Sequence, residues 1–496
     1  MSKSLTPDEE FLVQNQVPQL VNDMILHILR TRPKNVLESS LSYLNSQRLA
    51  SLGVGVPTIL LPKAGTDMTK WSVIACDQYT SEPEYWDKVK ATVGDAPSTY
   101  NMILPEVFLE GPEEESVIQH VGKSMKAYTS SDILEKQKPG WVILDRKTSV
   151  VPSRKGLMVA LDLERYSYEK GSTTLMRATE GTILARLPPR VKVREAASVE
   201  LPHIMVLIDD PEMSVIEPLF TQNLPKAYDF DMMMNGGHLK GYSVTGEAQI
   251  EQVAAALSKL ADPELYAKKY GLSSVPDSSN ILLYAMGDGN HSFATAKLHW
   301  EKTKAAAQDK EAIMSHPARY ALVELVNIHD PGLEFEGIHR VLFGTSRDAL
   351  FDSAKSWFAA RGCTFSSEDV SSAEAAIKGA EASCDTAHKL GFCCPKGNGV
   401  ITINKPTKNL ETATIQEFLD QFLADNKGVK IDYVHGVNAV SALSAKEGNV
   451  GIFCPTIDKS SFFKTIIMDG AFPRKTFSMG ESDEKRFYVE CRAIVP

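Results

Sequence analysis

The chain has 496 residues, and its 43% hydrophobic and 23% charged residues are proportions typical of a globular protein with a buried core. Its formal net charge of −10 argues against nonspecific binding to nucleic acid or to an anionic membrane surface. Its seven cysteines include no Cys-x-x-Cys pair, and neither a long apolar run nor an apolar leader is present, so we expect a cytoplasmic protein in a reducing compartment.

Two helices are predicted near the start of the chain. Apolar residues recur at helical spacing between Leu20 and Leu29, Pro33 then breaks the run, and a second apolar stripe joins Leu37 to Leu44. Two helices of this size cannot bury their apolar faces alone. We therefore expect them to pack on the main body or on a second copy of themselves.

The sequence at 17–45 resembles the dimerisation and docking module of the regulatory subunit of cAMP-dependent protein kinase, in its pattern of helix, Arg-x-Pro and helix. The resemblance implies a homodimer that binds an amphipathic anchoring helix through residues 17–45, and a cytoskeletal or flagellar address. A helical hairpin folded onto its own enzyme is the alternative.

Strand-like runs at 58–61 and 71–76 precede a polar segment that contains two candidate carboxylates. Ser81-x-x-Glu84 has the pattern of a capping box that opens a helix, with Pro83 in the first turn. Glu84 is then structural, which leaves Asp77 and Glu82 as candidates for chemistry. A solvated first-turn glutamate is the alternative for Glu82.

The segment at 177–194 is rich in arginine and contains the candidate substrate-binding residues Arg177, Glu180 and Arg190. Pro188 and Pro189 argue against one continuous helix across it. We expect a strand at 190–194, which would place three basic side chains on one face for a phosphate or carboxylate. A salt-bridged, exposed strand face is the alternative.

An apolar run from Ile281 ends at Gly-Asp-Gly-Asn-His-Ser, residues 287–292, and a helical pattern follows. Glycines permit a positive φ and close backbone approach, and the first N–H groups of a helix are unpaired, so a phosphate would bind well at this turn. The alternative is a plain connection in which Asp288 or Asn290 caps the helix.

A length near 500 residues predicts several domains. We expect a helical segment at 1–50, a core at 51–345 and a C-terminal α/β domain at 346–496. Within the last, a loop near 470–481 carries Lys475 and Thr476, which could close over a phosphate. An ordinary exposed basic loop is the alternative.

Together, the segments around Asp77, Glu180, Asp288, His339 and Lys475 resemble an uncharacterised family that is similar to the free serine kinases of the ParB/sulfiredoxin superfamily. The resemblance spans most of residues 51–496. It implies an α+β fold with a ParB/sulfiredoxin-like mixed sheet core, joined to the C-terminal domain and the N-terminal hairpin.

The resemblance also implies a nucleotide-dependent phosphotransferase that acts on a small hydroxyl compound such as free serine, with Mg²⁺ and with ATP or ADP as donor. Free serine kinases carry Asp-Gly-His-His-Arg in the central motif, where this chain has Asn290 for the first histidine and Ser292 for the arginine. Those two departures bear on which nucleotide serves as donor and on which amino acid or other hydroxyl compound serves as acceptor. No cysteine occupies the turn, which disfavours a sulfinic acid reductase.

Three groups of candidate site residues follow from the motifs and the resemblance. The residues assigned to catalysis are Asp288, Glu82 and His291, with Asp288 or Glu82 as the base. Those assigned to nucleotide or phosphate are Gly287, Gly289, Asn290, Ser292, Lys475 and Thr476. Those assigned to substrate are Asp77, Arg177, Glu180 and Arg190. The sequence assigns no ligand to a metal.

A second class of function is a nucleotide-binding regulatory or scaffold protein that dimerises through its N-terminal helices. Turnover that depends on an added hydroxyl compound would favour the kinase, and tight nucleotide binding without such turnover would favour the regulator. A nuclease is poorly supported, because the chain is acidic and lacks a basic face interleaved with aromatic residues.

Overall fold

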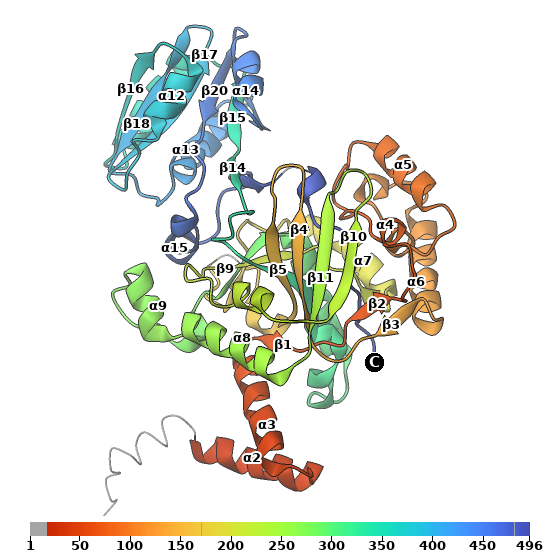
Figure 1. The fold of residues 1–496 in the computed structure, drawn as a ribbon. Helices are drawn as coiled ribbons and strands as arrows, with labels where there is room; N and C mark the ends of the chain where they lie inside the picture. Colours follow the sequence, from red (N-terminus) through yellow and green to blue (C-terminus); the bar gives the residue numbers. More distant parts are fainter. Residues whose placement is uncertain (1–16, 170, 481) are drawn as a thin grey trace, which may run out of the picture.

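The computed structural model describes residues 17–169, 171–480 and 482–496. Figure 1 shows a large sheet with helices around it, a second sheet domain above and to one side, and two N-terminal helices that project below. Within the described residues, no helix is both long and apolar enough to cross a membrane.

The two predicted N-terminal helices are α2 (Val17–Thr31) and α3 (Val36–Ser51), which confirms the break at Pro33. The His27 and Tyr43 rings pack between them with centroids 5.0 Å apart. Leu49 and Leu52 join the core of the main body, and α3 contacts α8 (Glu247–Leu260). The hairpin is therefore attached through α3, while α2 extends into solvent (Figure 1).

The large sheet is mixed, which confirms the predicted α+β fold class. Its strand order is β10-β11-β4-β5-β13-β9-β12-β7-β6, with β1 also paired to β5. The pairs β13–β9, β12–β7 and β6–β7 are parallel and the others antiparallel. In that order the strands are Lys226–Asp231, His238–Val244, Trp141–Lys147, Arg154–Asp162, Tyr320–Asn327, Met205–Ile208, Tyr284–Asp288, Met176–Arg177 and Tyr166–Ser167, with β1 at Val54–Gly55.

Both faces of this sheet are covered, which explains the nearly continuous apolar runs in its central strands. Leu157, Val159 and Leu161 of β5 point into one core with α8 and α10 (Asn290–Ala306). Met158 points into the opposite core with Trp86 of α5 (Pro83–Val93). Successive side chains of a strand face opposite sides, so the positions in the middle of β5, residues 156–161, are all apolar or small.

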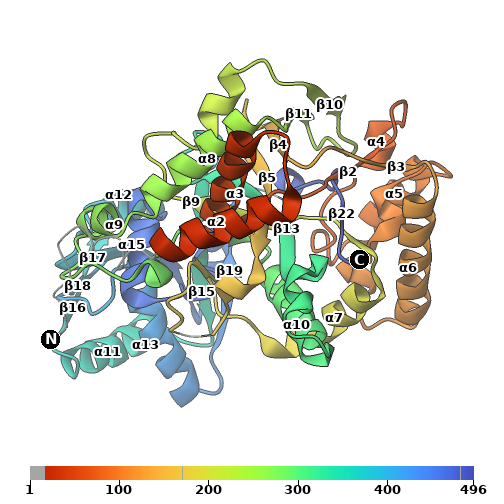
Figure 2. The same ribbon diagram turned by 90° about the horizontal axis from the view of Figure 1, so that it is seen from below.

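The other elements of the main body surround the sheet. The helices are α4 (Met68–Trp71), α6 (Glu114–Ser130), α7 (Leu187–Ala196), α9 (Pro263–Tyr270) and α15 (Lys459–Asp469). The short strand pairs are β2 (Leu60–Pro62) with β3 (Leu134–Lys136), β8 (Val199–Glu200) with β22 (Arg492–Ala493), and β14 (Phe335–Gly337) with β21 (Phe477–Met479). Figure 2 shows α7 beside α10, and these two helices are in contact.

Three local predictions are wrong. The strand expected at 71–76 is absent from the described structure, because α4 ends at Trp71 and only Ile74 forms an isolated bridge. The capping box is also absent there, because α5 starts at Pro83 with Glu82 at the N-cap and no side-chain cap. The strand at 190–194 is instead part of α7, whose first turn contains the prolines that were taken to exclude a helix.

The second sheet has six antiparallel strands, in the order β16-β18-β17-β20-β15-β19. They are Thr364–Val370, Gly397–Asn404, Ala387–Cys394, Asn449–Phe453, His339–Phe343 and Lys430–Val434. Its helices are α11 (Arg347–Ala359), α12 (Ala373–Ala380), α13 (Glu411–Asp425) and α14 (Val437–Ser444). Both helices and strands occur in the C-terminal region, as expected for an α/β domain, and the boundaries at 346–496 stay a prediction.

The end of the chain returns from the second sheet to the main body. The Ala75 N–H donates to the Arg486 carbonyl at 2.9 Å, and the Tyr488 N–H donates to the Val73 carbonyl at 2.8 Å. Further along, Leu60 and Cys491 exchange two backbone hydrogen bonds. Residues 486–491 therefore lie against the segment that precedes Asp77.

A buried charge network fixes this C-terminal segment. Arg486 is ion-paired with Glu324 of β13 and with Glu490. Arg146 of β4 donates to the carbonyls of Asp483 at 2.7 Å and Glu484 at 2.9 Å. Buried charges are tolerated only when they are paired and hydrogen-bonded, so the position of the segment is strongly specified.

We predict that Glu324→Gln destabilises the protein by about 3–5 kcal/mol, because it leaves the Arg486 guanidinium without one of its buried partners. Urea denaturation followed by circular dichroism measures the effect. The control is Asp132→Asn, which removes an exposed pair with Lys63 at 3.6 Å and is expected to cost less than about 1 kcal/mol. Equal denaturation midpoints for the two variants would contradict the role assigned to Arg486.

Candidate functional site

The central motif forms a strand, a tight turn and a helix, as predicted. Strand β12 ends at Asp288, Gly289 adopts φ +79°, and the 17-residue helix α10 begins at Asn290. A Cβ atom on Gly289 would lie 3.1 Å from the Cα atom of Ile204. Both the positive φ and the close approach therefore favour glycine at this position.

Asn290 ties the turn to the loop that carries Glu180. The Thr179 N–H donates to Asn290 Oδ1 at 3.2 Å, and Asn290 Nδ2 donates to Thr179 Oγ1 at 3.3 Å. Thr179 Oγ1 in turn donates to the Met286 carbonyl at 2.6 Å. The amide of Asn290 thus holds two loops together at the start of the helix.

A polar cavity of about 400 Å³ lies beside this turn. It is bounded by the central motif, by the segments at 77–78 and 179–180, by the late loop at 475–485, and by the second sheet domain. Its lining includes Asp77, Thr179, Glu180, Gly287, Asp288, Asn290, Tyr433, His435, Lys475 and Lys485. Five segments that are far apart in the sequence therefore contribute to one cavity.

Asp288 is paired with Lys485 inside this cavity. The Lys485 ammonium lies 3.2 Å from Asp288 Oδ2 and donates to the Met479 carbonyl at 3.0 Å. Burial opposes ionisation of Asp288, but Lys485 and the Gly289 N–H outweigh it and lower the pKa of this carboxyl group. Asp288 is consequently a carboxylate at neutral pH.

The pKa of Glu180 is shifted in the opposite direction. Burial raises its pKa, while the backbone N–H and the charge of Lys475 act against that rise. The Phe472 N–H donates to the Thr179 carbonyl at 2.7 Å, which aligns the late loop with this segment. Lys475 has φ +56° and is exposed at the rim, whereas Thr476 is buried and donates to the Pro473 carbonyl at 2.6 Å.

His291 lies among basic side chains. Its Nε2 atom accepts a hydrogen bond from the Ile183 N–H at 3.3 Å. Burial lowers its pKa, and the charges of Arg190, Arg186 and Arg474 lower it further. The imidazole is therefore neutral at physiological pH, next to three guanidinium groups that could attract an anion.

Other candidate residues lie outside the polar cavity. Glu82 is exposed at the start of α5, and Arg177 is buried with donors directed at the carbonyls of Thr174 and Asn280. Arg190 pairs with Glu106 at 2.5 Å. Ser292 is hydrogen-bonded to His203 at 2.7 Å and faces a neighbouring cavity.

Several residues at the site were missed by the sequence analysis, namely Thr179, His203, Tyr433, His435, Lys485 and Tyr488. Lys485 lies in an ordinary charged run, and His203 follows a proline in a connecting segment. No local pattern marks either residue. Lys485 reaches the site only because the C-terminal segment pairs with the main body, and Tyr488 of the same segment is hydrogen-bonded to His203 there.

No group of three or more His, Cys, Asp or Glu side chains among the described residues is arranged to hold a metal ion alone. Asp77 and Asp288 nevertheless both line the polar cavity. Mg²⁺ is often bound by one or two carboxylates together with substrate phosphates and water. The donor set fits a magnesium ion shared with a phosphate ligand.

We predict that Lys485→Met raises the pKa of Asp288, because burial is then no longer outweighed by the ammonium group. Because the pKa of Asp288 is lower in the folded than in the unfolded protein, its ionisation stabilises the fold at pH values above the unfolded-state pKa of about 3.9. This contribution is lost as the pH falls through the folded-state pKa. Carboxyl ¹³C NMR titration measures the change. Lys302→Met, which removes a distant exposed pair with Glu195, is the control. An unchanged Asp288 titration in Lys485→Met would refute the pairing.

Comparisons with known proteins give remote structural likenesses. A free serine kinase in complex with AMP has 10% identity and a TM-score of 0.34, over 68% of this chain and 91% of that chain. A conserved hypothetical protein from Pyrococcus furiosus has 11% identity and a TM-score of 0.31, over 65% and 90%. SbnI from Staphylococcus aureus, truncated at its C-terminus, has 10% identity and a TM-score of 0.30, over 68% and 87%.

Structural similarities with TM-scores this low do not assign a function. The relationship to the ParB/sulfiredoxin superfamily stays a prediction. A comparison with curated proteins gave no match. A family model described as a protein of unknown function, DUF1015, matches residues 60–422, which is most of the chain. The chain therefore belongs to the DUF1015 family.

Proposed function

We propose that this protein is a phosphotransferase that moves a phosphoryl group from ATP or ADP to a small hydroxyl compound. The observation that carries the proposal is the polar cavity, where a helix N-terminus, two lysines and several carboxylates meet. Phosphoryl transfer needs mainly positioning and neutralisation of charge, and these groups supply both.

The nucleotide phosphates would lie at the start of α10. The first N–H groups of a helix are unpaired within it, and the helix dipole favours an anion there. Lys475 at the rim would add positive charge, and the charges of Arg186 and Arg474 also act at His291.

An acceptor hydroxyl would be activated by Asp288 or Asp77. The structure favours Asp288 over Glu82, because Asp288 lines the cavity as a carboxylate whereas Glu82 is exposed elsewhere. In the transfer, the acceptor oxygen bonds to the terminal phosphorus and the bond from phosphorus to the nucleotide oxygen breaks. The hydroxyl proton passes to the carboxylate.

Magnesium would be held by Asp77 or Asp288 together with the phosphates. When bound, it would neutralise charge on the transferred group. The Lys485 ammonium, 3.2 Å from Asp288 Oδ2, favours the charged form of Asp288. The carboxylates, the lysines and the helix N-terminus would thus surround the donor phosphates and the transferred group in this cavity.

A regulatory dimer is a second candidate function, which a separate observation favours. The α2 residues Val21, Ile25 and Leu29 are 42%, 46% and 63% exposed, and Leu41 of α3 is 50% exposed. Their spacing of four residues gives an unpartnered apolar stripe along α2. Such a stripe fits association with a second copy or with an amphipathic anchoring helix.

The phosphotransferase is tested by incubating the protein with ATP or ADP, Mg²⁺ and a panel of serine, threonine, homoserine and small hydroxy acids. We expect a phosphorylated acceptor, detected by ³¹P NMR and mass spectrometry. Asp288→Asn should reduce its rate of formation by about 10²–10⁴-fold, because the base is lost. Asp352→Asn, an exposed change in α11, is the control and should leave the rate unchanged.

The absence of a phosphorylated acceptor, with nucleotide still bound, would reject the enzyme and favour the regulatory protein. Nucleotide binding itself is read by isothermal titration calorimetry on the same samples. Loss of binding in Asp288→Asn would assign the residue to nucleotide recognition and not to proton transfer.

The dimer is tested by placing charge on the apolar stripe. We expect the wild-type protein to be a dimer in size-exclusion chromatography with light scattering, and the double variant Ile25→Glu, Leu29→Glu to be a monomer. Gln47→Glu adds charge at an exposed polar position of α3, away from the stripe, and should stay dimeric. A truncation at residue 53 is less informative, because Leu49 and Leu52 belong to the core of the main body. A monomeric wild-type protein would refute dimerisation.

A further inference from the structure

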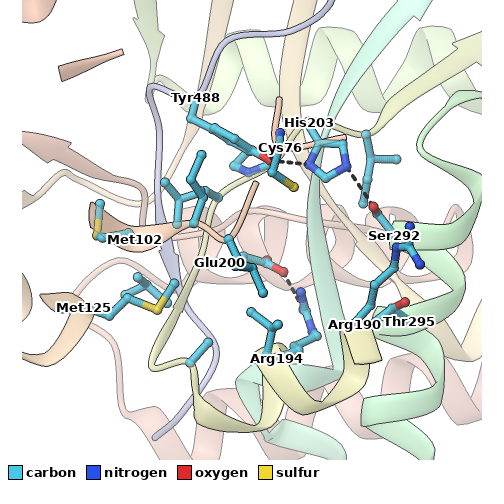
Figure 3. Close-up of a pocket in the computed structure, with 18 of the residues that line it drawn as sticks. Cys76, Met102, Met125, Arg190, Arg194, Glu200, His203, Ser292, Thr295 and Tyr488 are labelled. Carbon is cyan, nitrogen blue, oxygen red and sulfur yellow. Dashed lines mark hydrogen bonds and ion pairs between the residues drawn. The ribbon is translucent and has the colours of Figure 1, made fainter. Parts of the chain in front are cut away.

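A second cavity, of about 150 Å³, lies next to the polar one. Figure 3 shows Met102 and Met125 on one side of it, with Ser292 and Thr295 across from them. Its wall is mostly apolar and includes Val193 of α7, Ala197 at the C-cap of that helix, and Leu322 of β13. The cavity is therefore lined mainly by apolar side chains.

The charged residues around this cavity are already paired with one another. Arg190 pairs with Glu106, and Arg194 pairs with Glu200, both with a shortest distance of 2.5 Å. Figure 3 shows the second pair at the edge of the cavity. Because these charges compensate each other, the cavity suits the uncharged part of a ligand.

One wall carries a chain of hydrogen bonds. His203 Nε2 lies 2.7 Å from Ser292 Oγ, and His203 Nδ1 lies 2.8 Å from the Tyr488 hydroxyl oxygen (Figure 3). The Tyr488 hydroxyl also accepts from the Cys76 N–H at 3.1 Å. Hydroxyl and imidazole groups that face an apolar cavity at one end can bind a single polar group of a ligand.

His203 also connects the two cavities. Its Nε2 atom lies 3.9 Å from Asp77 Oδ2, and Asp77 lines the polar cavity. A ligand hydroxyl at the Ser292–His203 end would therefore lie close to Asp77, at the boundary with the polar cavity.

We infer that the apolar cavity holds the hydrocarbon part of the acceptor, with the acceptor hydroxyl directed at His203 and Ser292. The inference rests on the proposed phosphotransferase function. An apolar cavity of about 150 Å³ is large enough to hold benzene. The acceptor class is therefore a hydroxyl compound with an aryl or branched alkyl group of about that size, and free serine would leave the cavity unfilled.

The inference is tested first by binding, without nucleotide. Benzyl alcohol is the probe, glycerol is the comparison without an apolar group, and affinity is measured by NMR titration. Ala197→Leu places three further carbon atoms at the cavity wall. Ala91→Leu makes the same change at an exposed position of α5 and is the matched control.

We expect wild type and Ala91→Leu to bind benzyl alcohol with equal affinity, and Ala197→Leu to bind it at least tenfold more weakly. Glycerol should bind to none of the three proteins in the concentration range in which benzyl alcohol binds wild type. Val193→Phe is a second filling variant, to be used if Ala197→Leu melts at a much lower temperature. Equal binding by filled and control variants, or no binding by wild type, would overturn the inference.

Transfer assays then separate this inference from the proposed function. Phosphorylation of benzyl alcohol by wild type and Ala91→Leu, but not by Ala197→Leu, supports both. Phosphorylation of serine that Ala197→Leu leaves unchanged, with none of benzyl alcohol, overturns the apolar acceptor and leaves the phosphotransferase standing. Benzyl alcohol binding in the cavity with no transfer to any acceptor rejects the phosphotransferase and the acceptor role together.

Discussion

The buried pairing of Arg486 with Glu324 and Glu490 is the interaction on which both cavities depend. It fixes the C-terminal segment against the large sheet, at a desolvation cost that only good pairing offsets. One residue before it, Lys485 reaches Asp288, and two residues after it, Tyr488 reaches His203. A Cβ atom on Gly156 would lie 2.6 Å from Glu324 Oε1, so the sheet itself leaves room for the buried carboxylate.

This arrangement gives two neighbouring cavities with different chemistry. The polar one has carboxylates, lysines and the N-terminus of α10, and it suits charged phosphates. The apolar one has methionine and branched aliphatic side chains and suits a hydrocarbon group. His203, whose Nε2 atom lies near both Ser292 and Asp77, connects them. Under the proposed function, one cavity would hold the donor and the other the acceptor.

The parts of the fold that could be predicted from the sequence are those set by local chemistry. The turn at Gly289 follows from an apolar run that ends at glycine, and the N-terminal helices follow from apolar spacing and Pro33. The helix at Arg190 was missed because Pro188 and Pro189 were taken as helix-breaking residues, although the first turn of a helix tolerates proline. Asp77, Glu180, Asp288 and Lys475 came from motifs, whereas Lys485, His203 and Tyr488 meet only through long-range pairing that no local pattern reveals.

The central claim is that nucleotide phosphates bind at the start of α10, and a crystal structure with ADP and Mg²⁺ tests it most directly. The account predicts the terminal phosphate within hydrogen-bond reach of the N–H groups of Asn290 and His291, with Lys475 beside it and the metal on Asp77 or Asp288. A nucleotide bound against the second sheet domain and away from Gly289 would contradict the account, as would crystals that bind none at saturating concentration.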